Sequence, residues 1–354
     1  MQAEENRQDI KSMLPEELAA VMAEMGEKPY RAGQIFAWLN RGVRSFDEMT
    51  NLSKHFREKL SRAFFITSPK VASRQESQLD GTIKFLWAMG DGSMIESVVM
   101  RYRYGNTVCI SSQVGCRMGC RFCASTLGGL TRNLTPAELL DQVLFSQNEA
   151  GLKISNIVLM GIGEPLDNFE NVMQFLKLVS HPDGLGIGMR RITLSTCGLT
   201  EIIDKMGSYG LQLTLSVSLH APDDATRSRL MPVNRISGIG PLMEACGRYF
   251  KSTGRRVSFE YAMIDGVNDT PAHAARLAAL VKPAGGHVNL IPLNPVEERG
   301  LRPSEKETVS NFAEVLRQSG VGVTVRRRLG RDIDAACGQL RQKRAEAPLI
   351  GGEA

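Results

Sequence analysis

Three segments near the N-terminus repeat apolar residues at the spacing of an amphipathic helix. They are LPEELAAVMAEM, RAGQIFAWLN and LSKHFREKLSRAF, all within residues 14–64. Apolar side chains that recur every three or four residues share one face of a helix and can pack against a neighbour. We therefore predict a helical module over residues 1–69. Its many Lys and Arg residues leave open whether it presents a solvated surface or a nucleic-acid contact.

Residues 70–106 follow a different pattern, with two runs rich in β-branched and aromatic residues. The two runs flank GDGS, at residues 90–93, and a Gly-Asp-Gly turn between strands is typical of a β hairpin. From Thr107 onward, strand patterns alternate with helix patterns. The strand candidates are residues 107–112, 156–161, 191–196, 213–220, 257–264, 287–293 and 321–326.

Capping signals mark where two of the intervening helices begin. Thr135, Pro136 and Glu138 have the spacing of a capping box with proline in the first helical turn. Ser304 and Glu307 repeat the Ser-x-x-Glu spacing before VSNFAEVLRQSG. These signals support the prediction that helices separate the strands in this part of the chain.

Alternation of this kind predicts right-handed βαβ units and a parallel sheet. About six such units are fewer than the eight that close a full barrel. The predicted fold is thus α/β, with an open, partial (βα)6 barrel over residues 107–340. The helical module and a β hairpin extension at residues 70–106 precede it, and we expect residues 341–354 to form a frayed tail.

The amino-acid composition indicates a globular protein and does not indicate a particular function. The 354 residues are 42% hydrophobic and 23% charged, as in a globular protein with a large core. The net charge of +5 permits a nucleic-acid partner without requiring one. Apolar runs are short of the roughly 18 residues of a membrane helix, and the first ten residues lack a signal-peptide pattern. We therefore expect a cytoplasmic monomer with reduced cysteines.

Cysteines provide the clearest chemical signal. Four of the seven, Cys109, Cys116, Cys120 and Cys123, lie within one stretch, and the last three have the spacing C-x3-C-x2-C. Three thiolates can hold three irons of a cubane cluster and leave the fourth iron open to a ligand. A structural zinc site normally takes four ligands, commonly as two separated pairs, and the sequence has no second pair. The spacing favours an iron–sulfur cluster over zinc.

Polar residues at strand ends form a second candidate site. MGIGEPLDN follows the strand candidate at 156–159, and Gly163 and Glu164 in it could offer a carbonyl and a carboxylate to an ammonium group. Ser195, His220 and Asn294 also lie at or just past predicted strand ends. Ligands gather at the carboxyl ends of parallel strands, although a single polar residue there often has only a structural role.

The C-x3-C-x2-C loop directly after a strand resembles that of the radical S-adenosylmethionine (SAM) enzymes. The resemblance implies one 4Fe–4S cluster held by Cys116, Cys120 and Cys123, with SAM chelated to the open iron. One electron then splits SAM and releases a 5′-deoxyadenosyl radical. The GEP segment is similar to the superfamily motif that binds the amino group of SAM, which would place Gly163 and Glu164 at that group.

Longer motifs narrow the resemblance to the RlmN family. They are CISSQVGCRMGCRFC, RNLTPAELLDQV, LSVSLHAPDDATRSRLMPVNR, VNLIPLNP and GRDIDAACGQL, spread over nearly the whole chain. The resemblance implies methylation of adenine C2 in 23S rRNA and tRNA. The related Cfr family methylates adenine C8 and is the alternative; Pro165 in GEPL weakly favours C2. A zinc-stabilised RNA-binding protein and a radical SAM enzyme of another function also remain open.

The family resemblance also implies a reaction sequence. One SAM methylates Cys337, and the radical from a second SAM takes a hydrogen from that methyl group. The methylene radical then adds to adenine, Glu96 takes the ring proton, and Cys109 releases the product through a transient disulfide with Cys337. From the residues themselves, Glu96 could equally lie on the solvent face of the hairpin, and Cys109 and Cys337 could be buried structural thiols.

Further positions match family contacts. Those matching SAM contacts are Ser195, Ser218, Leu219, His220 and Asn294, and Phe122 is a weaker candidate for packing on the SAM adenine. Cys197 and Cys246 have no predicted role beyond structure. We expect RNA to contact the helical module and the basic segments RRIT and VRRRLGR, and a reducing protein such as flavodoxin to supply electrons.

Overall fold

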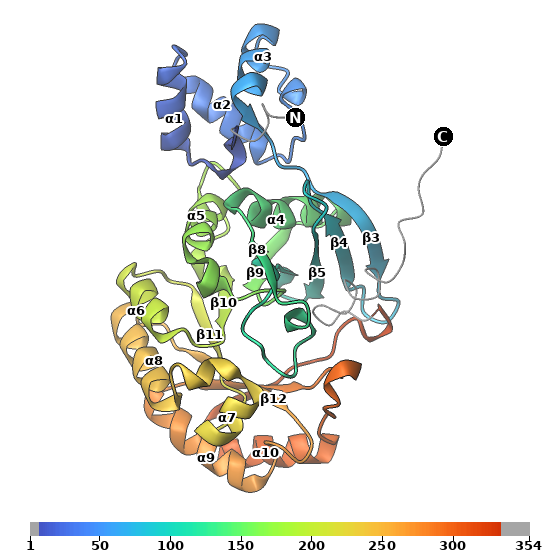
Figure 1. The fold of residues 1–354 in the computed structure, drawn as a ribbon, viewed down its shortest axis with the longest axis vertical. Helices are drawn as coiled ribbons and strands as arrows, with labels where there is room; N and C mark the ends of the chain where they lie inside the picture. The colour runs from blue at the N-terminus through green and yellow to red at the C-terminus, as the bar shows by residue number, and fades with distance from the viewer. Residues whose placement is uncertain (1–6, 334–354) are drawn as a thin grey trace.

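The computed structural model describes residues 7–333. Its centre is a ten-stranded sheet in the order β14-β13-β12-β11-β10-β9-β6-β5-β4-β3 (Figure 1). Seven of these strands pair in parallel from β6 to β14. They are β6 (Gly105–Cys109), β9 (Ile154–Leu159), β10 (Ile192–Thr196), β11 (Thr214–Ser218), β12 (Ser258–Met263), β13 (His287–Pro292) and β14 (Gly322–Val325).

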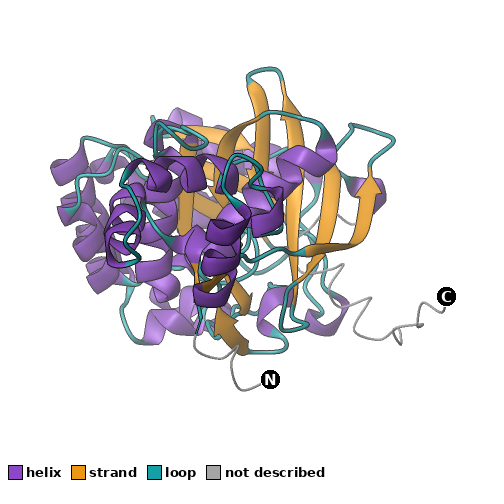
Figure 2. Cartoon of the chain, turned by 90° about the horizontal axis from the view of Figure 1, so that it is seen from above, coloured by secondary structure: helices purple, strands orange, loops and turns teal. Residues whose placement is uncertain are grey.

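Helices connect successive parallel strands and cover the outer side of the sheet. Figure 2 shows most of the helices of the molecule on the left and the longer strands on the right. The connecting helices are α4 (Pro136–Ala150), α5 (Phe169–Ser180), α6 (Thr200–Ser208), α7 (Asp224–Leu230), α8 (Ile239–Thr253), α9 (Pro271–Val281) and α10 (Lys306–Gln318). The predicted partial (βα)6 barrel is confirmed, with β14 as an added edge strand.

One of the two predicted capping boxes is confirmed and the other is wrong. At α4 the Thr135 side chain accepts from the Glu138 N–H, and the Glu138 carboxylate accepts from the Thr135 N–H at 2.9 Å. At α10 the capping residue is Glu305, without a side-chain cap bond. Ser304 instead donates its hydroxyl to the buried Asp269 carboxylate at 2.7 Å. A buried carboxylate needs a hydrogen-bond donor, so the Ser304 hydroxyl bonds to Asp269 instead of capping α10.

The segment from residue 70 to 106 extends the barrel sheet with antiparallel strands. The predicted hairpin is present as β4 (Ile83–Ala88) and β5 (Met94–Tyr102). A further strand, β3 (Lys70–Glu76), pairs with β4 at the outer edge and was not predicted. β5 pairs with β6, so Val98 lies directly opposite Cys109. The hairpin is thereby continuous with the strand that leads into the cysteine loop.

Helices α1 (Pro15–Glu24), α2 (Tyr30–Leu39) and α3 (Lys54–Ala63) form the N-terminal module, as predicted. Two small sheets complete the described strands: β1 (Gln8–Asp9) with β2 (Phe64–Phe65), and β7 (Gln113–Gly115) with β8 (Leu130–Asn133). A buried ion pair fastens the module to the barrel, because Lys11 Nζ lies 2.7 Å from Asp141 Oδ1 on α4. No described helix is long and apolar enough to span a membrane.

Replacing Lys11 by Met is expected to lower the free energy of unfolding by about 3–5 kcal/mol, because it leaves the Asp141 carboxylate buried without its cation. Both side chains of the pair are fully buried. Urea unfolding followed by circular dichroism measures the loss. Lys205→Met is the control, since Lys205 pairs with Glu170 at the surface. Equal stability of the Lys11 and Lys205 variants would contradict the assignment.

Candidate active site

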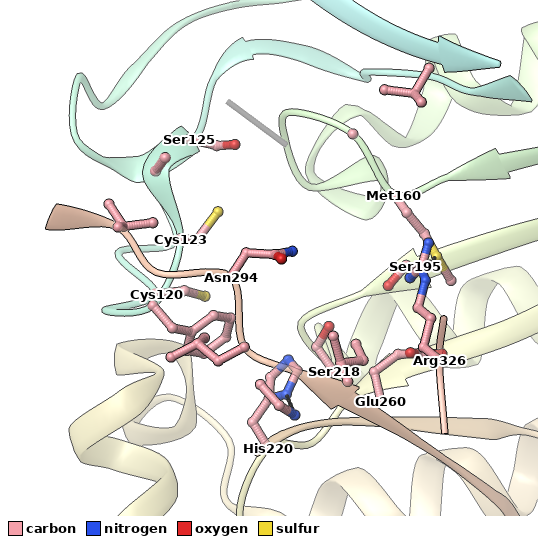
Figure 3. Close-up of a pocket in the computed structure, with 18 of the residues that line it drawn as sticks. Cys120, Cys123, Ser125, Met160, Ser195, Ser218, His220, Glu260, Asn294 and Arg326 are labelled. Atoms are coloured by element: carbon pink, nitrogen blue, oxygen red, sulfur yellow. Dashed lines mark hydrogen bonds between the residues drawn. The ribbon is translucent and has the colours of Figure 1, made fainter. Parts of the chain in front are cut away.

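A cavity of about 470 Å³ opens at the carboxyl ends of the parallel strands. The cysteine loop after β7 forms one wall, and the segment that follows β14 forms another. Figure 3 shows Cys120 and Cys123 on one side, facing Met160, Ser195 and Arg326 across the cavity. The strand ends of the barrel thus bring together segments that are more than two hundred residues apart in the chain.

All three cysteines of the C-x3-C-x2-C loop line this cavity. Figure 3 shows the sulfur atoms of Cys120 and Cys123 pointing into it. The loop is pinned at its start, where the Cys116 N–H donates to the Gly129 carbonyl at 2.8 Å. Gly115 adopts φ +80° at this point, and a Cβ there would lie 2.0 Å from the same carbonyl oxygen. A side chain at residue 115 would therefore displace the cysteine loop.

The loop residues fit an iron–sulfur cluster better than a single metal ion. Across residues 7–333, no three His, Cys, Asp or Glu side chains converge closely enough to surround one ion. Tetrahedral zinc would draw its thiolates to within about 4 Å of one another, whereas a cubane spreads them over separate irons. Burial raises the pKa of Cys116 to about 12 and also raises that of Cys120, so bound iron must displace their protons.

Glu164 also lines the cavity, beside the cysteine loop. Its Oε2 accepts from the Cys197 N–H at 2.7 Å, and its Oε1 accepts from the Leu166 N–H at 3.0 Å. The Glu164 N–H in turn donates to the side chain of Gln113 at 2.8 Å. Burial raises the pKa of Glu164, while these N–H donors act to lower it. The two backbone bonds fix the carboxylate in one orientation at the cavity edge.

Gly163 is sterically required at its position. It adopts φ +106°, and a Cβ there would lie 2.6 Å from Gln113 Cβ and 2.7 Å from Gln113 N. Strain of this kind costs about 1–3 kcal/mol, so Gly163→Ala is expected to weaken SAM binding about tenfold or more. Isothermal titration calorimetry with SAM measures the change. Gly188→Ala, where a Cβ meets open space, is the control, and equal SAM affinity in both variants would contradict the prediction.

Four of the five strand-end residues predicted to contact SAM line the cavity, and Leu219 does not. The side chain of Leu219 is fully buried in the apolar core, which leaves only its backbone for a ligand. The cavity-lining positions are Ser195, Ser218, His220 and Asn294. The sequence identified the right strand ends, but alternation of side chains along the chain turns Leu219 away from the cavity.

His220 is held in a strained conformation at the centre of this group. Its φ of +57° is the sole positive value at a non-glycine residue between residues 7 and 333. Nδ1 accepts from the Ala262 N–H at 2.9 Å, and burial lowers the pKa of His220 to about 3. The ring meets Phe122 edge-to-face, with centroids 4.5 Å apart. A neutral imidazole and an aromatic ring therefore pack against each other in the lining of the cavity.

Glu96 is buried, so the alternative that places it on a solvent face is wrong. It lies on β5, with its Oε1 3.7 Å from Nζ of the fully buried Lys84. Residues alternate along a strand, so Glu96 shares a face with Val98 and Met100, which line the cavity. Cys109 packs in one apolar cluster with Val98, Met100 and Met160. Glu96 and Cys109 therefore border the cavity wall without lining it.

Cys337 lies outside the described residues, so its distance from Cys109 and from the cysteine loop stays untested. The six cysteines within the described part of the chain are free thiols. The predicted transient disulfide between Cys109 and Cys337 therefore has no support in this structure and stands as a prediction.

Sequence reasoning missed several cavity residues. Cys197, assigned a structural role, lines the cavity, and Met160 and Glu260 do so as well. The Glu260 carboxylate accepts from Ser216 Oγ at 2.5 Å and from Asn289 at 2.9 Å. Polar residues at every second position of otherwise apolar parallel strands, as in SVS and SFE, were the available signal for an inward polar face.

The two basic segments line two cavities, and Arg326 lines both of them. The cavity wall after β14 carries Arg326, Arg327, Arg328 and Arg331 from the VRRRLGR segment. Arg190 and Arg191 of RRIT instead line a second cavity of about 320 Å³ that also includes Thr193, Thr214 and Ser258. These belong to the start or middle of strands, whereas the first cavity opens at strand ends. The VRRRLGR segment therefore borders both cavities, and the RRIT segment borders the second.

Comparisons with known proteins agree with this geometry. Residues 110–278 match the model of the radical SAM superfamily. Residues 8–66 match the model described as the ribosomal RNA large subunit methyltransferase N-terminal domain. The crystal structure of a radical SAM methyltransferase from Sphaerobacter thermophilus superposes with a TM-score of 0.90 at 43% identity, covering 94% of this chain and 98% of that one. The fold and the site thus define a radical SAM enzyme, with a 4Fe–4S cluster and SAM as cofactors.

Full-length relatives give the family. The probable dual-specificity RNA methyltransferase RlmN of Lachnoclostridium phytofermentans is 48% identical over 99% of this chain and 99% of its own length. That of Bacillus licheniformis is 52% identical over 95% of this chain and 94% of its own. The chain belongs to the RlmN family.

Proposed function

We propose that the protein methylates C2 of adenine in 23S rRNA and in tRNA, using two SAM molecules per turnover and Cys337 as the methyl carrier. The observation that carries the proposal is a single cavity lined by three cluster thiols, polar strand ends and an arginine-rich wall. Its relatives of similar length are named dual-specificity RNA methyltransferases. The cavity would hold SAM at the cysteine loop and admit the adenine beside the arginines.

The chemistry explains why a methyltransferase would need such a site. Adenine C2 lies between two ring nitrogens and is electron-poor, so it cannot displace a methyl group from a sulfonium. The cluster, when bound, supplies the electron that splits SAM into methionine and a 5′-deoxyadenosyl radical. A carbon-centred radical can add to an electron-poor ring, which makes a carrier thiol and a radical initiator necessary together.

Five residues have separate roles in this proposal. Glu164, fixed by two backbone N–H groups, would orient the amino group of SAM. Cys337 would carry the methyl group, and Glu96 would take the proton lost from the ring. The unpaired electron left on the adduct would return to the cluster, so that the electron that splits SAM is recovered. Lys84, buried 3.7 Å from Glu96, stabilises the charge of that carboxylate. Cys109 would attack the sulfur of Cys337 and form a disulfide, and the released carbon would take up a proton to become the methyl group; a reductant would then reopen the disulfide.

RNA binding would rest on charge and on base flipping. The arginines between residues 326 and 331 and the module at residues 1–69 would contact phosphates, so affinity should fall as salt rises. The adenine must leave its stack to reach the strand ends. We further propose that the enzyme works as a cytoplasmic monomer and takes its electrons from a reducing protein such as flavodoxin.

Nucleoside mass spectrometry tests the position of methylation. Reconstituted protein is incubated with SAM, a reductant and transcripts of 23S rRNA fragments or tRNA, and the RNA is then digested. We expect 2-methyladenosine from both RNA classes. The Cys246→Ala variant, which removes a thiol buried in the core outside the cavity, should give the same product. 8-Methyladenosine would show the Cfr-like activity, and unmodified RNA would contradict the proposal.

A further inference from the structure

Arg227 in α7 is fully buried, yet among the described residues its guanidinium hydrogen-bonds no carboxylate. Four neutral oxygens accept from it. They are the carbonyls of Cys197 at 2.7 Å, Ser218 at 3.1 Å and Leu219 at 3.1 Å, and the side chain of Asn234 at 2.7 Å. A guanidinium is protonated in proteins, so its positive charge remains in the interior, where the Asp224 carboxylate is linked to it only through Asn234, which donates to Asp224 Oδ1 at 2.8 Å.

The three carbonyls belong to backbone that shapes the cavity. Cys197 directly follows β10, which carries Ser195, and Ser218 ends β11. Leu219 precedes His220, whose positive φ turns the chain at this point. One side chain therefore ties the ends of two neighbouring strands, and these ends present three of the predicted SAM contacts to the cavity.

The residue after Cys197 makes room for this contact. Gly198 adopts φ +101°, and a Cβ there would lie 2.8 Å from Leu242 Cδ1 and 3.4 Å from Arg227 Nη2. The Cys-Gly pair of STCG thus gives the guanidinium access to the Cys197 carbonyl. The sequence motif and the buried arginine form one structural unit.

The helix that carries Arg227 also touches the cysteine loop. The Leu230 carbonyl at the end of α7 accepts from the Arg121 N–H at 2.9 Å. Leu230 and Met231 pack in one apolar cluster with Cys120 and Cys197. Apolar surroundings screen charge weakly, so a cation on this helix acts on the loop more strongly than one in solvent.

We propose that Arg227 is a positioning residue for the SAM pocket and that its buried charge raises the reduction potential of the cluster held by Cys116, Cys120 and Cys123. This inference rests on the proposed function, since it requires that the loop hold a cluster. Reduction adds one negative charge to the cluster, and a nearby buried cation stabilises the reduced form. The hydrogen bonds act separately, by setting the strand ends that contact SAM.

Two substitutions separate the charge from the hydrogen bonds. Arg227→Gln removes the charge, and Arg227→Lys keeps it but loses the fork that reaches both strand ends. A redox titration followed by electron paramagnetic resonance, without RNA, measures the cluster midpoint, and calorimetry measures SAM affinity. In Arg227→Gln we expect reduction to be about tenfold less favourable, which is about 59 mV for one electron. In Arg227→Lys the midpoint should stay, while SAM binds about tenfold more weakly.

Arg229→Gln is the matched control, because it removes an exposed arginine from the same helix and should leave both quantities unchanged. A wild-type midpoint in Arg227→Gln would overturn the role of the charge. If Arg227→Gln fails to hold a cluster, Arg227→Lys provides the test of the charge. Because lysine keeps the positive charge, a lowered midpoint in Arg227→Lys would overturn the proposal that the charge sets the potential. Wild-type SAM affinity in Arg227→Lys would overturn the positioning role. Absence of any cluster in the unmutated protein would instead contradict the proposed function.

Discussion

Replacement of Cys120 by Ala is expected to abolish the reductive cleavage of SAM. Cys120 is one of three thiols that line the cavity from a single loop, and no fourth cysteine of the described chain lies in that loop. Loss of a partner that merely supports a metal ligand costs about 10–100-fold, so loss of a ligand should exceed about 100-fold. Iron content and 5′-deoxyadenosine formation, measured anaerobically with dithionite, give the result.

Cys246→Ala is the matched control for this loss. Cys246 is buried on α8 in the main core, and its substitution also removes one thiol. We expect this control to bind iron and cleave SAM like the unmutated protein. Wild-type cleavage by the Cys120 variant would show that the loop does not hold the reactive cluster. Zinc in place of iron in the unmutated protein would also contradict the assignment of an iron–sulfur cluster to this loop.

Replacement of Cys109 by Ala is expected to trap RNA covalently on the protein. Without the resolving thiol, the bond between the carrier sulfur and the adenine cannot be broken by exchange. Release of methylated RNA should therefore fall by about 100-fold or more, in line with the loss of a nucleophile from a reaction that depends on it. A denaturing gel with labelled RNA detects the adduct as a band that protease digestion removes.

The same Cys246→Ala protein controls for the loss of a buried thiol and should release its RNA normally. A double variant that lacks both Cys109 and Cys337 should form no adduct, because the carrier thiol is then missing. Free methylated RNA from the Cys109 variant at the wild-type rate would contradict its resolving role. Absence of both adduct and product would indicate that Cys109 acts before the methyl group reaches the base.

Strong periodic patterns in the sequence were enough to predict most of the fold. The parallel strands from β9 to β13 are short runs rich in apolar and β-branched residues and bounded by turns, and the structure has strands at each of them. β3 was missed because no residue of KVASRQE is buried at the sheet edge, so the segment lacks the alternation of a half-buried strand. The Ser304 cap failed because Asp269, distant in sequence, takes its hydroxyl.

The candidate site was predictable where local spacing defines the chemistry. Cysteine spacing placed three thiols on one cavity wall, and strand ends supplied Ser218 and His220. Burial of Glu96 against Lys84 depends on pairing between strands, which no local pattern reveals. Arg227 is likewise invisible within DATRSRL, because its three carbonyl partners come from two different strand ends. Site residues defined by their spacing along the chain could be predicted from the sequence. Site residues defined by contacts between distant segments could not.

The most direct test of the account uses SAM with a fully deuterated methyl group. If the methyl group passes through a carrier thiol and a radical, one deuterium leaves with the deoxyadenosyl fragment before the carbon reaches the base. We therefore predict that mass spectrometry will find two deuterium atoms in the methyl group of 2-methyladenosine and one in 5′-deoxyadenosine. A methyl group that keeps all three deuterium atoms, with unlabelled 5′-deoxyadenosine, would show direct transfer and contradict the account.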